Sequence, residues 1–332
     1  MCAASAVLFG ATTPISKVLL DSIPPITLAG LLYLGAAVAA APFAARQRTT
    51  PPGTADRARL AGAVIVGGAI APVLLLVGLD RTPAPTASLL LNLELVATAV
   101  LATLIFGEHI GRRAGLGLGL LTTAGLVLAG TGGSVTWGAA LIISACLCWG
   151  LDNNLTATAT SITPAQITLA KGVVAGSVNL VLGLLTEHSD LAASAIAWSL
   201  VVGAAGYGAS IILWIAGARL VGAARSQGVF ATAPFIGVVL GWVIASGGIL
   251  VSQVIALAVM ALGIWIVIGS DHSHEHRHDP TLHTHAHRHD DDHHDHTHDQ
   301  PVTGAHLHEH EHDLLVHTHD HLPDETHRHD HQ

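Results

Sequence analysis

Long runs of apolar residues, separated by short polar breaks, cover the first 270 residues of the chain. The stretch 60–79 has no charged residue, and neither has the stretch 226–269. Because a membrane-spanning helix needs about 20 mostly apolar residues, runs of this kind are long enough to cross a bilayer. Breaks at proline, glycine and charge clusters divide this part into about ten segments. The pattern predicts an all-α polytopic membrane protein with about ten transmembrane helices.

The first apolar segment lacks a basic leader and a small-residue cleavage site, so we interpret it as a span and not as a signal peptide. The predicted spans are 2–20, 26–45, 58–79, 86–106, 114–130, 137–157, 165–185, 195–217, 226–245 and 251–269.

Basic residues orient these spans. With a cytoplasmic N-terminus, the outer loops hold Arg81 alone, and the inner loops hold Arg46, Arg48, Arg57, Arg59, Arg112, Arg113, Arg219 and Arg225. This asymmetry obeys the positive-inside rule. We therefore expect an integral protein of the cytoplasmic (inner) membrane with both termini in the cytoplasm.

The two halves of the apolar part resemble each other. Pro-Pro-Ile-Thr-Leu-Ala at 24–29 recurs as Pro-Ala-Gln-Ile-Thr-Leu-Ala at 164–170, and Phe9-Gly10 matches Trp149-Gly150. Five spans is an odd number, so the second copy is inverted in the membrane, as in many transporters. The expected domains are a first five-helix repeat at 1–133, a second at 134–270 and a tail at 271–332.

Several segments resemble the ten-span EamA-type branch of the drug/metabolite transporter superfamily. They are 87–95 (Ala-Ser-Leu-Leu-Leu-Asn-Leu-Glu-Leu), 106–110 (Phe-Gly-Glu-His-Ile), the glycine-rich 115–130 and 144–150 (Ser-Ala-Cys-Leu-Cys-Trp-Gly). The resemblance implies export or import of metabolites or toxic compounds, but it does not indicate which solute is transported. One departure is Glu94-Leu95, where the family often has Glu-Pro.

Charged side chains within a span are costly, about 2.5–3.5 kcal/mol at a helix centre on insertion scales, and mark functional sites by default. Lys171, Glu94 and Asp152 lie within predicted spans, and Asn153 follows Asp152. Lys171 is a candidate ligand for a substrate carboxylate, and the two acids are candidates for a coupling proton. A structural ion pair or a polar helix contact is the alternative.

Two further groups within the spans have less specific roles. Asn92 completes the candidate substrate pathway, although it faces away from Glu94 on a helix. Trp149, Tyr207 and Trp214 are expected mainly as anchors at the membrane interface. The sequence has no nucleotide-binding loop, nucleophile elbow or zinc-protease motif, so we do not expect an enzyme or a required cofactor in the apolar part.

The last 62 residues differ entirely: they have few hydrophobic residues and a net charge of −12 against +3 for residues 1–270, which together give the −9 of the whole chain. Such a segment cannot bury a core and is predicted to be disordered. Neutral imidazole binds Zn²⁺, Ni²⁺ and Co²⁺. The candidate metal ligands are His272, His274, His276, His278, His283, His285, His287, His289, His293, His294, His296, His298, His306, His308, His310 and His312.

Three functions remain open. The first is a secondary transporter that exports small metabolites or drugs by alternating access and has a metal-binding or metal-sensing tail. The second is an exporter of Ni²⁺, Co²⁺ or Zn²⁺. The third is a membrane-anchored metal store or sensor without transport. Expected partners are the lipid bilayer, a small-molecule substrate and divalent metal ions, with a homodimer left open and no nucleic acid.

Overall fold

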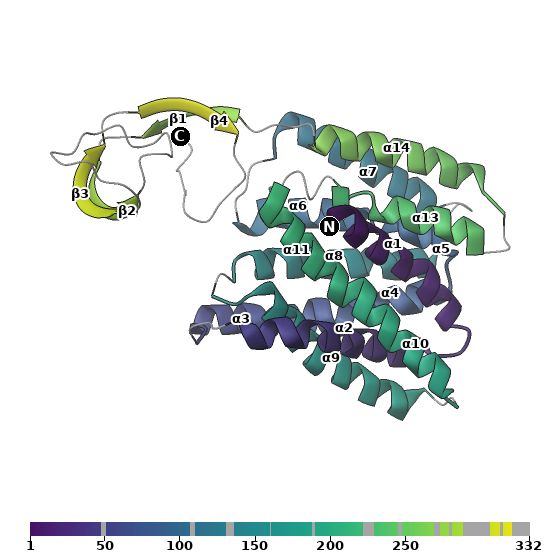
Figure 1. Cartoon of the computed structure of the whole chain (residues 1–332). Helices are drawn as coiled ribbons and strands as arrows, with labels where there is room; N and C mark the ends of the chain where they lie inside the picture. Colours follow the sequence, from purple (N-terminus) through teal and green to yellow (C-terminus); the bar gives the residue numbers. More distant parts are fainter. Residues whose placement is uncertain are drawn as a thin grey trace. The chain divides into compact units, whose positions relative to one another are not determined.

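The protein divides into two units, residues 1–270 and 271–332, which are described separately. The computed structural model describes residues 1–47, 51–106, 110–130, 136–159, 161–187, 190–221, 229–244, 248–268, 273–278, 281–287, 306–312 and 315–320. The first unit is a helical bundle (Figure 1).

The described residues of the bundle form ten spans, and several of these consist of two or three consecutive elements. They are α1 (Cys2–Leu19); α2 (Pro25–Arg46); α3 (Thr54–Ala63) with η1 (Val64–Ile70) and α4 (Ala71–Asp80); α5 (Ala84–Leu90) with α6 (Leu93–Phe106); α7 (Arg112–Ala129); α8 (Trp137–Ala157); α9 (Pro164–Thr186); α10 (Ala193–Gly203) with η2 (Ala204–Ala209) and α11 (Ser210–Val221); α13 (Ala233–Ile244); and α14 (Val251–Ile268).

Most of these spans match the predicted ones closely. Among the described residues, eight helices are long and apolar enough to cross a bilayer. Two shorter or more polar helices complete the set of ten: α7, whose apolar average is lowered by Arg112 and Arg113, and α13, which has 12 residues. The predicted all-α fold with about ten spans is confirmed.

Interruptions of the helices recur at the same place in both repeats. The π-helical segments η1 and η2 begin at Val64 and Ala204, 140 positions apart (204 − 64). A tight turn between α5 and α6 has the Asn92 N–H donating to the Leu89 carbonyl at 3.1 Å, and the Thr232 N–H donates in the same way to Val229 at 3.2 Å. Asn92 and Thr232 are again 140 apart, so both interruptions were duplicated with the repeat.

Equivalent helices of the two repeats pack against each other in opposite directions. Near one end of the α2–α9 pair, Gly183 lies against Thr27, and further along Gly30 lies against the backbone of Leu180. As the residue number rises along α2 it therefore falls along α9. The equivalent fourth and ninth spans also meet in opposite directions, here through α5 and α13, with Pro85 beside Gly241 and Ser88 beside Gly237. A twofold axis across the helices produces antiparallel packing of this kind between equivalent spans, in agreement with the inverted repeat predicted.

Glycine makes these close contacts possible. A Cβ added at Gly30 would overlap the backbone of Leu180, and one at Gly203 would overlap the backbone of Leu32. Small residues allow membrane helices to approach closely, where dispersion and not hydrophobic exclusion holds them together. Large apolar side chains such as Leu104, Val243 and Trp265 are instead exposed, as expected for side chains that face lipid.

The described parts of the tail are four strands in two separate antiparallel pairs. β1 (Ser273–His278) pairs with β4 (Leu315–Asp320), and β2 (Thr281–His287) pairs with β3 (His306–His312). In these short pieces the backbone is extended and paired. The physical reason is the His-x-His alternation, since a period of two residues suits an extended strand.

Candidate substrate site

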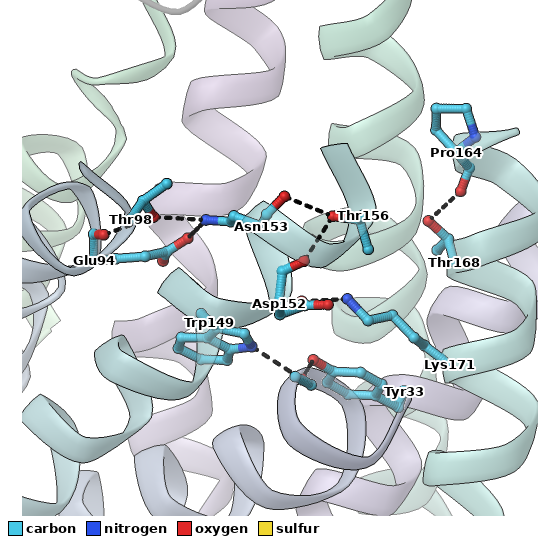
Figure 2. A network of polar contacts seen from close by, with 11 residues as sticks. Tyr33, Glu94, Thr98, Trp149, Asp152, Asn153, Thr156, Pro164, Thr168 and Lys171 are labelled. Atoms are coloured by element: carbon cyan, nitrogen blue, oxygen red, sulfur yellow. Dashed lines mark hydrogen bonds and ion pairs between the residues drawn. The ribbon is translucent and has the colours of Figure 1, made fainter. Parts of the chain in front are cut away.

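Glu94 lies at an interruption midway along the Ala84–Ile105 span. It is in the first turn of α6, directly after the tight turn, and its N–H donates to the Leu91 carbonyl at 3.0 Å. Its Oε1 accepts a hydrogen bond of 2.9 Å from Asn153 Nδ2 on α8. Asn153 Nδ2 also donates to Thr98 Oγ1 at 3.2 Å. These bonds join α6 to α8 through polar side chains (Figure 2).

Asp152 and Lys171 form an ion pair between α8 and α9, in which Lys171 Nζ donates to Asp152 Oδ2. The pair is well shielded, with Asp152 only 3% exposed. The second carboxylate oxygen, Asp152 Oδ1, is buried and has no hydrogen-bond partner. The carboxylate packs directly on Gly67 of η1, where any Cβ would overlap it. A charge pair and an unsatisfied acceptor thus lie against a π-helical segment.

The interruption at η1 also exposes a backbone acceptor. Gly67 is midway along the Thr54–Asp80 span, and its carbonyl accepts hydrogen bonds from Tyr33 Oη at 2.8 Å and Trp149 Nε1 at 3.0 Å. Figure 2 shows Trp149 and Tyr33 converging beside the Asp152–Lys171 pair. π-helical turns in α-helices occur frequently at functional sites. Discontinuous helices near the midplane also mark binding sites in transporters.

An aromatic cluster continues from this point toward η2. The rings of Tyr33 and Tyr207 have centroids 5.7 Å apart, and Tyr207 meets Phe9 edge-on at 6.0 Å. Phe9 in turn lies 5.3 Å from Phe230, and Phe230 lies 6.3 Å from Trp214. The cluster therefore connects α2, η2 and α1 through ring contacts.

The structure brings together four of the five candidates named from sequence: Lys171, Asp152, Asn153 and Glu94. Asn92 lies apart from them. It is buried, and its Nδ2 donates to the Leu89 carbonyl at 3.2 Å and contacts Met260 Sδ of α14 at 3.7 Å. The hydrogen bond to Leu89 closes the turn between α5 and α6, and the contact with Met260 connects this turn to the tenth span.

Sequence reasoning missed Tyr33, Thr98 and Phe9, and it placed Trp149 wrongly. Trp149 is buried and donates inward, because the freed Gly67 carbonyl offers its indole N–H an acceptor inside the bundle. It is not an interface anchor. The alignment of Phe9-Gly10 with Trp149-Gly150 was the available signal, since it places one aromatic residue at the same point of each repeat.

The candidate metal ligands all belong to the second unit of the chain. His272, His289, His293, His294, His296 and His298 lie outside the described residues, and for the others only the backbone of β1, β2 and β3 is described. Within the described part of the chain, no group of three or more His, Cys, Asp or Glu side chains could hold a metal ion. Among these described side chains, Glu94 and Asp152 are therefore not part of such a group.

The family model that matches this chain is the EamA-like transporter family, over residues 1–130 and 136–269. The chain belongs to the EamA-like transporter family. Its two matched segments correspond to the two five-helix repeats of the bundle, so the EamA-like chain is an integral membrane transporter.

Two further likenesses agree with this EamA-like assignment. An uncharacterized transporter of Methanothermobacter thermautotrophicus is 26% identical over 290 residues, which are 79% of this chain and 83% of that protein. A solved crystal structure matches with a TM-score of 0.58 at 16% identity and covers 80% of this chain and 96% of its own. The structural likeness shows the fold alone.

Proposed function

We propose that the chain is a secondary transporter that exports a small organic solute by alternating access. The observation that carries this proposal is the buried Asp152–Lys171 ion pair with its unpartnered Asp152 Oδ1. Charges within a bilayer are expensive, and here they lie beside a helix interruption at the interface of the repeats. A buried ion pair of this kind contributes little to the free energy of unfolding. Its charged groups can, however, exchange their bond to each other for a bond to a substrate.

Polar contacts between the two repeats at opposite ends of the bundle support alternating access. At one end, the Glu187 carboxylate after α9 accepts hydrogen bonds from the N–H groups of Ile26 and Thr27, at 3.0 and 2.8 Å. This caps the start of α2, whose first N–H groups have no helical partner. From the arginine distribution along the sequence, we assign this end to the outside.

At the other end, α3 is held to the turn between α8 and α9. The Asp56 carboxylate accepts a hydrogen bond from the Ser161 hydroxyl, and Arg59 Nη1 donates to the Thr158 carbonyl at 2.6 Å. Asp56 and Arg59 also pair with each other at 2.9 Å. We assign this contact to the cytoplasmic side. In an alternating-access cycle the two end contacts open in turn, while the site between them stays fixed.

The histidine-rich tail has a second role in this proposal, as a cytoplasmic appendage that binds Zn²⁺, Ni²⁺ or Co²⁺ loosely at several places. The transported solute is organic, because the described bundle offers two acids and no larger group of metal ligands. The 22 histidines after residue 270 favour two alternatives. One is an exporter of metal ions, and the other is a metal store without transport.

Flux into inside-out membrane vesicles separates these functions. We would compare full-length protein with residues 1–270, using radiolabelled Ni²⁺, Co²⁺ and Zn²⁺ beside a panel of amines, carboxylates and amino acids. Saturable uptake of an organic solute by both forms is expected. Absence of metal flux in both would exclude a metal exporter, and saturable flux of any solute would exclude a store without transport.

Two variants connect the flux to the site. Lys171→Ala should abolish organic flux at a normal membrane level of protein. Asp80→Asn changes a half-exposed carboxylate at the end of α4 and should leave the flux unchanged. Normal flux through Lys171→Ala would contradict the assignment of the site.

A further inference from the structure

The inverted repeats divide the centre of the bundle into two chemically different halves. Adding 140 to a position in the first repeat gives its counterpart in the second. Asp152 corresponds to Thr12 and Lys171 to Leu31. Glu94 corresponds to Pro234, so the second repeat has no acid there. The ionisable groups are thus confined to α6, α8 and α9, and none of their counterparts on α13, α1 and α2 is ionisable.

The other half is aromatic. The counterpart of Gly67 in η1 is Tyr207 in η2, and the ring of Tyr207 lies between Phe9 and Tyr33. Two halves that are related by symmetry therefore present an ion pair on one side and rings in edge-on and tilted contact on the other. Tyr33 belongs to both halves, since its hydroxyl reaches Gly67 beside Asp152 while its ring contacts Tyr207.

The charged half has more acceptors than donors. It combines two carboxylates with one ammonium group, and that ammonium group is already bonded to Asp152 Oδ2. Asp152 Oδ1 is buried without a partner, and Glu94 receives a hydrogen bond only from the neutral amide of Asn153 among the contacts described. A buried acceptor without a donor is energetically costly, because it has lost its hydrogen bonds to water. With both acids ionised, two carboxylates and one ammonium group leave one net negative charge, which a positively charged donor would offset.

The aromatic half suits the rest of such a ligand. Aromatic rings prefer edge-to-face or offset contacts with other rings, and their faces also attract cations. Tyr33 and Tyr207 are in contact in this structure, so a ligand ring enters only when the repeats separate. Such separation is what alternating access provides.

We infer that the transported solute is an organic cation with an aromatic ring, its ammonium group held by Asp152 and Glu94 and its ring between Tyr33 and Tyr207. This inference rests on the proposed transport function and names the class of its substrate. An anionic solute would meet two carboxylates and a lysine that is already paired, and a small aliphatic amine would leave the aromatic half without a contact.

Four small probes test the two halves separately: phenethylammonium (cation with ring), 3-phenylpropionate (anion with ring), 2-phenylethanol (neutral with ring) and butylammonium (cation without ring). Their binding to full-length protein in lipid nanodiscs is measured by calorimetry. Phenethylammonium should bind at least about tenfold more tightly than the other three. Tighter binding of 3-phenylpropionate, or equal binding of all four, would overturn the inference.

Variants assign each half of the ligand to its residues. Asp152→Asn should weaken phenethylammonium binding by about tenfold or more, and Asp152→Glu, which keeps the charge, should retain more of it. Glu94→Gln is the second test of the charged half if Asp152→Asn does not fold. Tyr207→Leu should weaken phenethylammonium much more than butylammonium. Unchanged binding in all of these variants would contradict the inference, and Asp80→Asn is the matched control.

Flux distinguishes failure of this inference from failure of transport. Phenethylammonium that binds without crossing vesicle membranes would contradict the proposed transport function and leave the binding site intact. Saturable flux of carboxylates alone, with no binding of amines, would contradict the substrate class and leave transport standing.

Discussion

Lys171 on α9 bonds one oxygen of Asp152 on α8 and leaves the other oxygen of that carboxylate buried and unpaired. The pair lies between two helices of the second repeat and against a π-helical segment of the first. A movement of one repeat against the other therefore changes the surroundings of this carboxylate directly.

Removing one partner of the pair should cost more than removing both. Lys171→Met leaves a buried carboxylate without its counter-charge, and such losses destabilise proteins by about 3–5 kcal/mol. Adding Asp152→Asn should restore most of that stability and should not restore transport. Unfolding of purified protein in detergent, for the two single variants and the double variant, measures the coupling. Strictly additive effects would argue against a direct interaction.

Close packing of α2 on α9 predicts a sharp contrast between two glycines. Gly30→Ala would drive a methyl group into the backbone of Leu180, and overpacking of this kind costs about 1–3 kcal/mol. Gly119→Ala, on the exposed face of α7, adds a methyl group where nothing lies within 4 Å. Thermal unfolding should show a clear loss for Gly30→Ala and no loss for Gly119→Ala. Equal behaviour of the two variants would mean that the repeats do not meet at Gly30.

The cap on α2 predicts a graded series at Glu187. Its carboxylate accepts three hydrogen bonds, from the N–H groups of Ile26 and Thr27 and from the Thr27 hydroxyl. Loss of a helix cap costs about 1 kcal/mol, so Glu187→Ala should unfold at lower temperature than the parent, with Glu187→Gln between them. The exposed Asp190 in the same loop is the control, and Asp190→Ala should have no effect. A Glu187→Ala variant as stable as the parent would contradict the cap.

Truncation after residue 270 should separate metal binding from transport. The 1–270 protein should keep its organic flux and lose binding of Zn²⁺ and Ni²⁺, which calorimetry on both forms measures. Binding by the full-length protein should weaken as pH falls from about 7.5 to 5.5, because only neutral imidazole is a ligand and its usual pKa is about 6.5. Metal binding that survives truncation, or that does not change over this pH range, would contradict a role for the histidines.

The length of the hydrophobic runs was enough to predict the spans. A helix that crosses a bilayer must be long and apolar, whichever other helices it packs against. Lys171, Glu94 and Asp152 could be named because charge is rare and costly in that setting. The interruptions at η1 and η2 could not be foreseen: their glycine- and alanine-rich sequences, such as Val64–Ile70, fit an ordinary helix equally well.

The aromatic part of the site was missed for a related reason. Tyrosine and tryptophan serve both at membrane interfaces and in the interior, and their sequence neighbours do not separate the two settings. Trp149 is interior because a carbonyl freed at Gly67, 82 positions earlier, accepts its N–H. Only the folded backbone shows that acceptor.

The uneven sharing of charge and aromatic rings between the repeats has an energetic consequence for the cycle. A carrier built from two identical inverted halves would have inward-open and outward-open forms of equal free energy. Here a swap of roles between the halves would expose Asp152, Glu94 and Lys171 to water differently from Phe9, Thr12 and Tyr207. If the proposed alternating access holds, the empty carrier should therefore have an unequal resting distribution between its two forms, and the solute would cross against or along that bias.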